Sequence, residues 1–164
     1  ELKQLLAVEA MAHVPSPTRL VIAGAPDQPE HLVPVRRAIA HLGLDDRVDV
    51  LEGWLPEDDK RDLMARCLAC VFPPFDEDYG YVSLEAAHSS KPVITCTDSG
   101  GTLEFVEDGV TGLVAAPTPE ALGAAIATLA GDRRAAREMG VTAHTRAGAM
   151  GPSWDRVVDE LTRA

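Results

Sequence analysis

Two glutamates separated by seven residues, Glu77 and Glu85, are the side chains whose type and spacing most clearly suggest chemistry. They lie on either side of Gly80, where an apolar run gives way to a helical pattern. A carboxylate can accept two hydrogen bonds from a vicinal diol, and the free N–H groups at a helix N-terminus favour phosphate. The pattern predicts a site for a phosphorylated, hydroxyl-rich ligand, with Glu85 on the second helical turn and Glu77 on the preceding loop.

A second glycine loop, Asp98-Ser99-Gly100-Gly101-Thr102, follows the next apolar run. Because the carboxyl ends of parallel strands lie at one edge of a sheet, both loops are expected to border one crevice. Taken singly, these residues also have a simpler interpretation. Glu77 would be a solvated loop residue and Glu85 an exposed helix residue. Asp98 and Ser99 would only shape their turn through hydrogen bonds to the backbone.

Short apolar runs alternate with helical patterns along the whole chain. Strands are predicted at 19–25, 47–54, 70–74, 92–97 and 112–116. Helices are predicted at 2–13, 29–42, 56–67, 80–90, about 102–107, and from Thr118 onward with one break at 151–152. This alternation predicts an α/β fold: a Rossmann-like, doubly wound parallel sheet with helices on both faces.

The composition is that of one soluble globular domain, with 46% hydrophobic and 25% charged residues in 164. No apolar run approaches the roughly 20 residues that a membrane-spanning helix needs. The net charge of −11 argues against nucleic acid and anionic membranes as partners of this domain. An anionic ligand would have to be held by backbone N–H groups and a few cations.

The three cysteines indicate the redox environment of the protein. Cys67 and Cys70 form a CxxC pair, interpreted as small apolar residues at a helix–strand junction, with a redox pair or a zinc site as alternatives. The third, Cys96, makes the count odd, which fits a reducing, cytoplasmic setting.

The chain opens Glu-Leu-Lys-Gln without an initiator Met. We therefore expect a fragment that lacks its first strand.

The run from 71 to 114 resembles the retaining glycosyltransferases of family 4, which have the two-Rossmann-domain GT-B architecture. Their donor domain carries a Glu-x7-Glu motif, then Gly-Lys-Pro-Val-Ile, a Gly-Gly loop, and Glu-x-Val-x-Asp-Gly-x-Thr-Gly. The matching positions are Glu77, Tyr79, Gly80, Leu84, Glu85, Ala86, Lys91, Pro92, Val93, Ile94, Gly100, Gly101, Glu104, Val106, Asp108, Gly109, Thr111 and Gly112. Segments 19–25 and 53–55 also resemble parts of the family.

The resemblance implies roles for the residues around the first motif. Glu85 would hold the ribose hydroxyls of a nucleotide sugar, and Glu77, the catalytic residue, would contact hydroxyls of the transferred sugar. Backbone groups near Tyr79, Gly80 and Tyr81 would face the sugar and the diphosphate, stabilising the charge that develops on the leaving group.

Three further donor contacts are expected outside this motif, at Lys3, Gly24 and Trp54. Lys3 would match the family's diphosphate-binding lysine, or would be a solvated lysine at the end of the chain. Trp54 would border the nucleobase or pack in the core. Two positions depart from the family, since Asp78 and Ser90 each replace a usual glycine. The family's diphosphate-binding Arg belongs to a segment that this chain does not contain.

Taken together, these observations predict that residues 1–164 form a single donor domain that binds a nucleoside-diphosphate sugar. Its last helix, 153–164, would pack on a missing N-terminal acceptor-binding domain. The full-length enzyme would transfer a hexose with retention of configuration and without a metal or other cofactor, whereas the fragment alone would be inactive. A Rossmann-like binding module that has lost donor binding is the main alternative. A two-carboxylate glycoside hydrolase is another.

Overall fold

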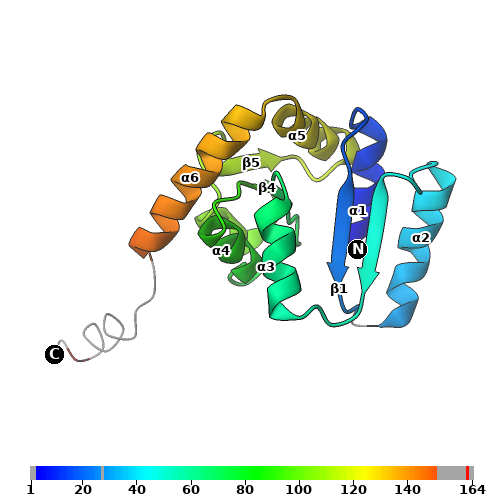
Figure 1. Ribbon diagram of the computed structural model, residues 1–164, viewed down its shortest axis with the longest axis horizontal. Coiled ribbons are helices and arrows are strands. Elements are labelled where there is room, and N and C mark those ends of the chain that lie inside the picture. Colours follow the sequence, from blue (N-terminus) through cyan, green and yellow to red (C-terminus); the bar gives the residue numbers. More distant parts are fainter. Residues whose placement is uncertain (1–2, 27, 151–161, 163–164) are drawn as a thin grey trace.

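The computed structural model describes residues 3–26, 28–150 and 162. Strands and helices alternate along the chain (Figure 1). The strands are β1 (Leu20–Gly24), β2 (Val48–Glu52), β3 (Cys70–Val71), β4 (Val93–Cys96) and β5 (Gly112–Ala115). The α-helices are α1 (Lys3–Ala10), α2 (Leu32–His41), α3 (Glu57–Arg66), α4 (Tyr81–His88), α5 (Pro119–Gly131) and α6 (Arg133–Met150). Short 3-10 helices are η1 (Met11–His13), η2 (Pro29–His31) and η3 (Gly100–Glu104).

All strand pairs between these elements are parallel. In the described residues, β1 pairs with β2 in one sheet, and β3, β4 and β5 form a second sheet with β4 in its centre. Helices surround the strands, and all four residues of β4 are buried. The predicted α/β fold with parallel strands and surrounding helices is confirmed, with its strands divided between two sheets.

One hydrophobic core joins the two sheets, and a smaller cluster lies beside α3 and α4. The main core combines side chains of α1, α2, α5, β2 and β4, among them Val8, Val35, Val48, Ile94 and Leu122. The smaller cluster is built on Ala86, Val93 and Val106, with Met64, Cys70 and Phe72 packed against it. The second sheet is therefore packed on both faces, as expected for parallel strands.

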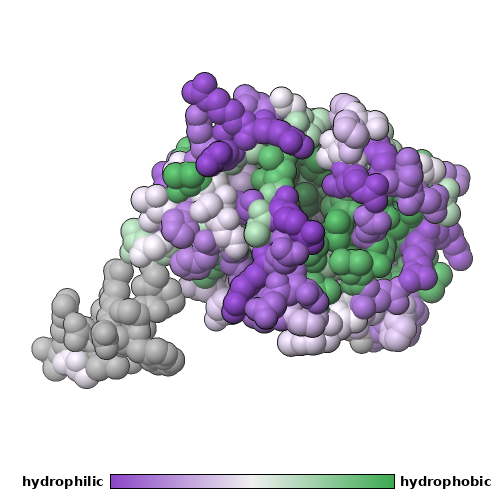
Figure 2. Space-filling view, viewed as in Figure 1, coloured by the Kyte–Doolittle hydropathy of each residue, from purple (hydrophilic) through white to green (hydrophobic). Residues whose placement is uncertain are grey.

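The strand predicted at 19–25 is confirmed as β1, which pairs in parallel with β2, but it is less buried than a continuous apolar run suggests. Val21 of β1 is 43% exposed, and Leu51 of the neighbouring β2 is 40% exposed. Figure 2 shows hydrophobic residues gathered over this sheet, beside a hollow bordered by the hydrophilic α3. The reason is topological, because β1 pairs only with β2, and β3 only with β4, among the described residues.

Two other elements differ from the prediction for local reasons. The predicted strand 70–74 is reduced to β3, since Pro73 and Pro74 have no N–H group to donate to a ladder. The helix predicted from Thr118 onward is interrupted at Asp132, whose φ of −127° and ψ of 82° leave the helical region. Its Oδ1 atom accepts a hydrogen bond from the N–H of Ala135 at 2.9 Å and so caps α6.

The predicted start of a helix at Thr118 is confirmed, because the Thr118 hydroxyl caps α5 by accepting a hydrogen bond from the N–H of Ala121. Thr162 is helical. The predicted break at 151–152 and the rest of the predicted helix 153–164 lie outside the described residues. Within the described part of the chain, no helix has the length and apolar character needed to cross a membrane.

Candidate functional site

The loops that follow β3 and β4 pack directly on one another. The N–H of Gly101 donates to the carbonyl of Glu77 at 2.6 Å, and the N–H of Asp76 donates to the carbonyl of Asp98 at 2.9 Å. A Cβ atom on Gly101 would lie 2.3 Å from the carbonyl oxygen of Asp78. The glycine pair predicted to border the crevice therefore holds the backbone of Glu77 in place.

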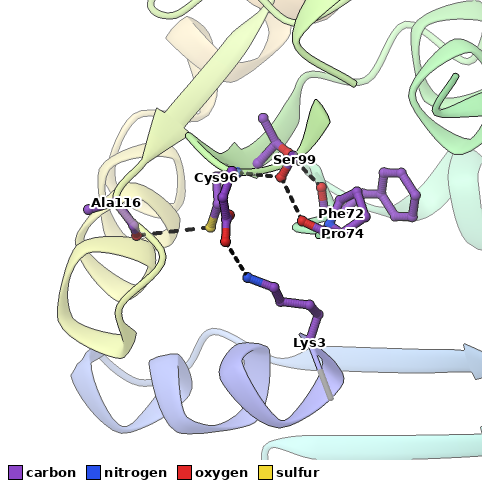
Figure 3. A network of polar contacts seen from close by, with 8 residues as sticks. Lys3, Phe72, Pro74, Cys96, Ser99 and Ala116 are labelled. Carbon is purple, nitrogen blue, oxygen red and sulfur yellow. Dashed lines mark hydrogen bonds and ion pairs between the residues drawn. The ribbon is translucent and has the colours of Figure 1, made fainter. Parts of the chain in front are cut away.

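Ser99 ties the same loops to the second sheet. Its buried hydroxyl donates to the carbonyl of Pro74 at 3.0 Å and accepts from the N–H of Cys96 at 3.1 Å (Figure 3). Within the sheet, the Thr95 hydroxyl donates to the carbonyl of Phe72 at 2.8 Å. The interpretation of Ser99 as a residue that shapes its turn is confirmed.

Gly80 directly precedes α4 in a left-handed conformation, with φ of 78° and ψ of 48°. This region favours glycine, and a Cβ atom here would lie 2.8 Å from the Thr102 hydroxyl. Thr102 thus occupies the space that a side chain at position 80 would need. No side chain of the described residues caps the N-terminus of α4. Its first N–H groups therefore remain available to an anionic ligand.

The two glutamates lie on either side of this helix start, in different environments. Glu85 is on the second turn of α4, and its 44% exposed side chain accepts a hydrogen bond from Lys60 of α3 at 2.8 Å. Glu77 is on the loop and half-buried, and its carboxylate makes no hydrogen bond or ion pair with the described residues. One carboxylate is held by a cation, and the other is free to receive hydroxyl groups.

Lys3 begins α1 and reaches the loop after β4. Its Nζ atom lies 2.8 Å from Oδ2 of Asp98 and 5.7 Å from the centre of the Phe75 ring. Figure 3 shows the Lys3 side chain extending from its helix toward the loops that hold Ser99 and Pro74. Its side chain is only 13% exposed, so the interpretation of Lys3 as a solvated terminal lysine is wrong. The other oxygen of Asp98, Oδ1, is buried and has no partner among the described residues.

Three aromatic side chains are in contact at the start of α4. The Tyr79 ring lies 4.9 Å from the Tyr81 ring and 5.1 Å from the Phe105 ring, measured between ring centres. Tyr81 is 71% exposed. This aromatic cluster includes Tyr79, two residues after Glu77, in the segment where the sequence predicts a sugar.

Gly24 and Trp54 belong to the other sheet, at the carboxyl ends of β1 and β2. Gly24 has a φ of 141° and is exposed, and its carbonyl accepts a hydrogen bond from Gly53. Trp54 is 89% exposed, so its interpretation as a core residue is wrong. No hydrogen bond or ring contact joins Trp54 to the loops around α4 within the described residues. Its place beside a nucleobase stays a prediction.

Several residues of the matched motifs build the scaffold. The Lys91 ammonium donates to the carbonyls of Ala65 and Cys67, at 2.8 and 2.9 Å, and so caps the C-terminus of α3. Asp108 accepts from the N–H of Val114 at 2.8 Å and fixes the turn before β5. Ser90, which stands where the family has glycine, adopts a left-handed φ of 56°.

The three cysteines are free thiols. Burial raises the pKa of Cys70 to about 12 and that of Cys96 to about 11, and it also raises the pKa of Cys67. A raised pKa disfavours the thiolate that redox chemistry and metal binding require. Among the described residues, no group of three or more His, Cys, Asp or Glu side chains is placed to hold a metal ion.

Sequence reasoning missed Lys60. Its spacing to Glu57 indicates an ordinary pair within α3, and that contact exists at 3.2 Å. The contact with Glu85 spans 25 residues and depends on how α3 and α4 pack, which no local pattern encodes.

Comparison with known proteins supports a relationship over most of the chain. The family described as "Glycosyl transferases group 1" matches residues 3–146. The chain is 35% identical over 153 residues to the D-inositol 3-phosphate glycosyltransferase of Nocardia farcinica, covering 87% of this chain and 32% of that protein. It is 31% identical over 123 residues to an alpha-1,3/1,6-mannosyltransferase, ALG2, of Dictyostelium discoideum, covering 75% and 29%. The chain thus spans about a third of the length of these curated relatives.

Solved structures agree with this relationship. HepE of Anabaena, in complex with UDP and glucose, has a TM-score of 0.85 and 25% identity, covering 97% of this chain and 44% of that one. Sucrose-phosphate synthase of Thermosynechococcus elongatus has a TM-score of 0.85 and 26% identity, covering 97% and 40%. Family membership explains the parallel α/β fold, the matched motifs and the two glutamates on either side of the start of α4. The chain belongs to the group 1 glycosyltransferase family.

Proposed function

We propose that this chain is the donor-binding domain of a retaining glycosyltransferase that transfers a hexose from a nucleoside-diphosphate sugar. The observation that carries the proposal is the uncapped N-terminus of α4, with Glu77 and Glu85 on either side of it. The helix start would receive the diphosphate, Glu85 the ribose and Glu77 the transferred sugar. HepE, a structural relative, has been solved with UDP and with UDP-glucose, which supports a ligand of this class.

Each residue contributes binding or charge stabilisation in this proposal. The N–H groups at Tyr81 and Val82, at the start of α4, would stabilise the negative charge that develops as the nucleoside diphosphate leaves. Glu77 would hold the sugar hydroxyls and fix the orientation of the reacting carbon. Lys3 would supply positive charge near the diphosphate, from its position beside Asp98. We propose that no metal ion is needed and that the enzyme works in the cytoplasm.

The acceptor would be bound by another domain of the full-length enzyme. We therefore propose that the isolated chain binds donor without useful transfer to acceptors. Detectable sugar transfer by the purified 164-residue chain would overturn this part of the proposal.

We also propose that a parallel strand leading into α1 completes the sheet between β1 and β3. α1 begins beside Asp98, at the carboxyl end of β4, and the segment that follows it leads to the start of β1. A strand feeding α1 would thus run parallel to β1, and a right-handed crossover would place it next to β1. A longer chain that includes preceding residues should bury Val21 and protect its amide from hydrogen exchange; an unchanged exchange rate would contradict this.

The direct test is calorimetric titration of the chain with UDP, GDP and ADP, in buffer with EDTA. We expect one nucleotide to bind, and Glu85→Ala to weaken it about tenfold or more, since a hydrogen bond to a charged group is lost. Glu138→Ala is the matched control, because Glu138 is an exposed helix carboxylate that pairs with Arg134 of the same helix, α6. A folded chain that binds none of the three would favour a module that has lost donor binding.

A further inference from the structure

The Glu85 carboxylate is held by a cation from a neighbouring helix. Lys60 lies on α3, and its Nζ atom is 2.8 Å from Oε1 of Glu85. The same Nζ atom is 3.2 Å from Oε2 of Glu57, one turn earlier on α3. Glu57 and Glu85 thus hold the ammonium group between two helices, and the ammonium group in turn fixes the position of Glu85.

The other cations of α3 are arranged differently. Arg61 pairs with Glu57 and Asp58, and Arg66 pairs with Asp62 at 2.8 Å, all within the same helix. Such local pairs are common on exposed helices and contribute little. Lys60 is the cation of α3 that crosses to α4 among the described residues.

The contact with Lys60 orients Glu85 and still leaves its carboxylate able to bind a ligand. Its hydrogen bonds to Glu85 and then to Glu57 raise the pKa of Lys60, so the ammonium stays protonated at neutral pH. It engages Oε1 of Glu85, and a carboxylate has a second oxygen that can still accept. A glutamate without such a partner would lose rotamer freedom when a ligand binds, which weakens affinity.

We propose that Lys60 is a positioning residue that holds Glu85 in the orientation in which it recognises ribose hydroxyls. This inference rests on the proposed function, because it assigns Lys60 to the nucleotide part of the same site. Lys60 acts through Glu85, so its removal should reduce the discrimination between ribose and deoxyribose. A cation that acted only on the diphosphate would leave that discrimination intact.

The experiment measures affinity of the 164-residue chain for UDP, GDP and ADP, each beside its 2′-deoxy counterpart. We expect the wild type to prefer the ribonucleotide about tenfold, since the 2′-hydroxyl donates to a charged acceptor. Lys60→Met should reduce this preference to about twofold or less, and Lys60→Arg should retain most of it, because a guanidinium can also donate to Glu85. Arg66→Met is the matched control and should leave the preference unchanged. Circular dichroism and unfolding midpoints check that each variant folds.

The outcomes separate the two proposals. If the wild type binds with a ribose preference that Glu85→Ala abolishes, the proposed function stands. If Lys60→Met then keeps the preference, or weakens both nucleotides equally, the role of Lys60 is overturned by itself. If the wild type binds none of the nucleotides, the proposed function fails and this inference fails with it.

Discussion

Lys3 and Asp98, 95 residues apart in the chain, form an ion pair of 2.8 Å that connects α1 to the loop after β4. α1 packs with α2 beside the first sheet, whereas Asp98 lies on the loop that follows β4 of the second sheet. The pair therefore links the two sheets at their carboxyl edges, where the candidate site lies. Both side chains are largely buried, with 13% and 27% exposed.

Lys3→Met should destabilise the protein by about 2 kcal/mol, between the values typical of exposed and of fully buried pairs. The reason is that Asp98 would keep a charge without a partner, beside an Oδ1 atom that already has none. Chemical denaturation measures the change. Arg134→Met, which removes an exposed pair with Glu138, is the control and should cost less than about 0.5 kcal/mol. Equal effects of the two substitutions would show that the Lys3 pair contributes nothing special.

Gly101→Ala should weaken both folding and donor binding. The new methyl group would lie 2.3 Å from the carbonyl oxygen of Asp78, so one of the two loops must move. We expect a loss of about 3 kcal/mol, as for an overpacked site, and a lower affinity because Glu77 moves with its loop. Gly148→Ala is the control, since nothing lies within 4 Å of its added Cβ, and helix propensity predicts a gain of up to about 1 kcal/mol. If Gly101→Ala leaves the nucleotide affinity unchanged, this loop does not contribute to the donor site.

Ser90→Gly should raise the free energy of unfolding by about 1 kcal/mol, because a left-handed conformation costs this much for a residue with a Cβ atom. Ser90 has a φ of 56°. Its neighbour Ser89, with a φ of −84°, provides the control. Ser89→Gly should lower stability by about 0.5 kcal/mol, since glycine gains freedom in the unfolded chain. Thermal unfolding of both variants checks the sign; a loss in both would mean that the Ser90 hydroxyl matters more than its backbone.

The thiol of Cys70 should titrate far above its ordinary range. Burial raises its pKa from 9.0 to about 12, so the folded protein keeps this proton more tightly than the unfolded chain. The corresponding stabilisation is complete below pH 9 and is lost as the pH rises toward 12. The free energy of unfolding of Cys70→Ala should therefore fall less steeply above pH 9 than that of the wild type. Parallel curves for the two proteins would contradict the raised pKa.

A simpler measurement uses a thiol reagent at pH 8. All three cysteines have raised pKa values, so the folded protein should react more slowly than the same protein in guanidinium chloride. A fast-reacting thiol in the folded state would reopen the redox interpretation of Cys67 and Cys70.

Local signals in the sequence predicted the elements that depend on neighbouring residues. The alternation of apolar runs and helical patterns predicted the parallel α/β fold, and Thr118 with Pro119 predicted the start of α5. Local signals failed where two patterns compete. Asp132 interrupts a long helical pattern by capping the next helix, and Pro73 shortens a strand that is otherwise apolar.

The sequence by itself determined that Glu77 and Glu85 stand on either side of a helix start and that glycines occupy the adjoining loops, because these relationships span only a few residues. The tertiary structure decided what surrounds them. It placed Lys60 on Glu85, Lys3 on Asp98 and the backbone of Glu77 against Gly101. These contacts join residues 24 or more positions apart, and their energies depend on how whole elements pack, which periodicity and turn chemistry do not encode.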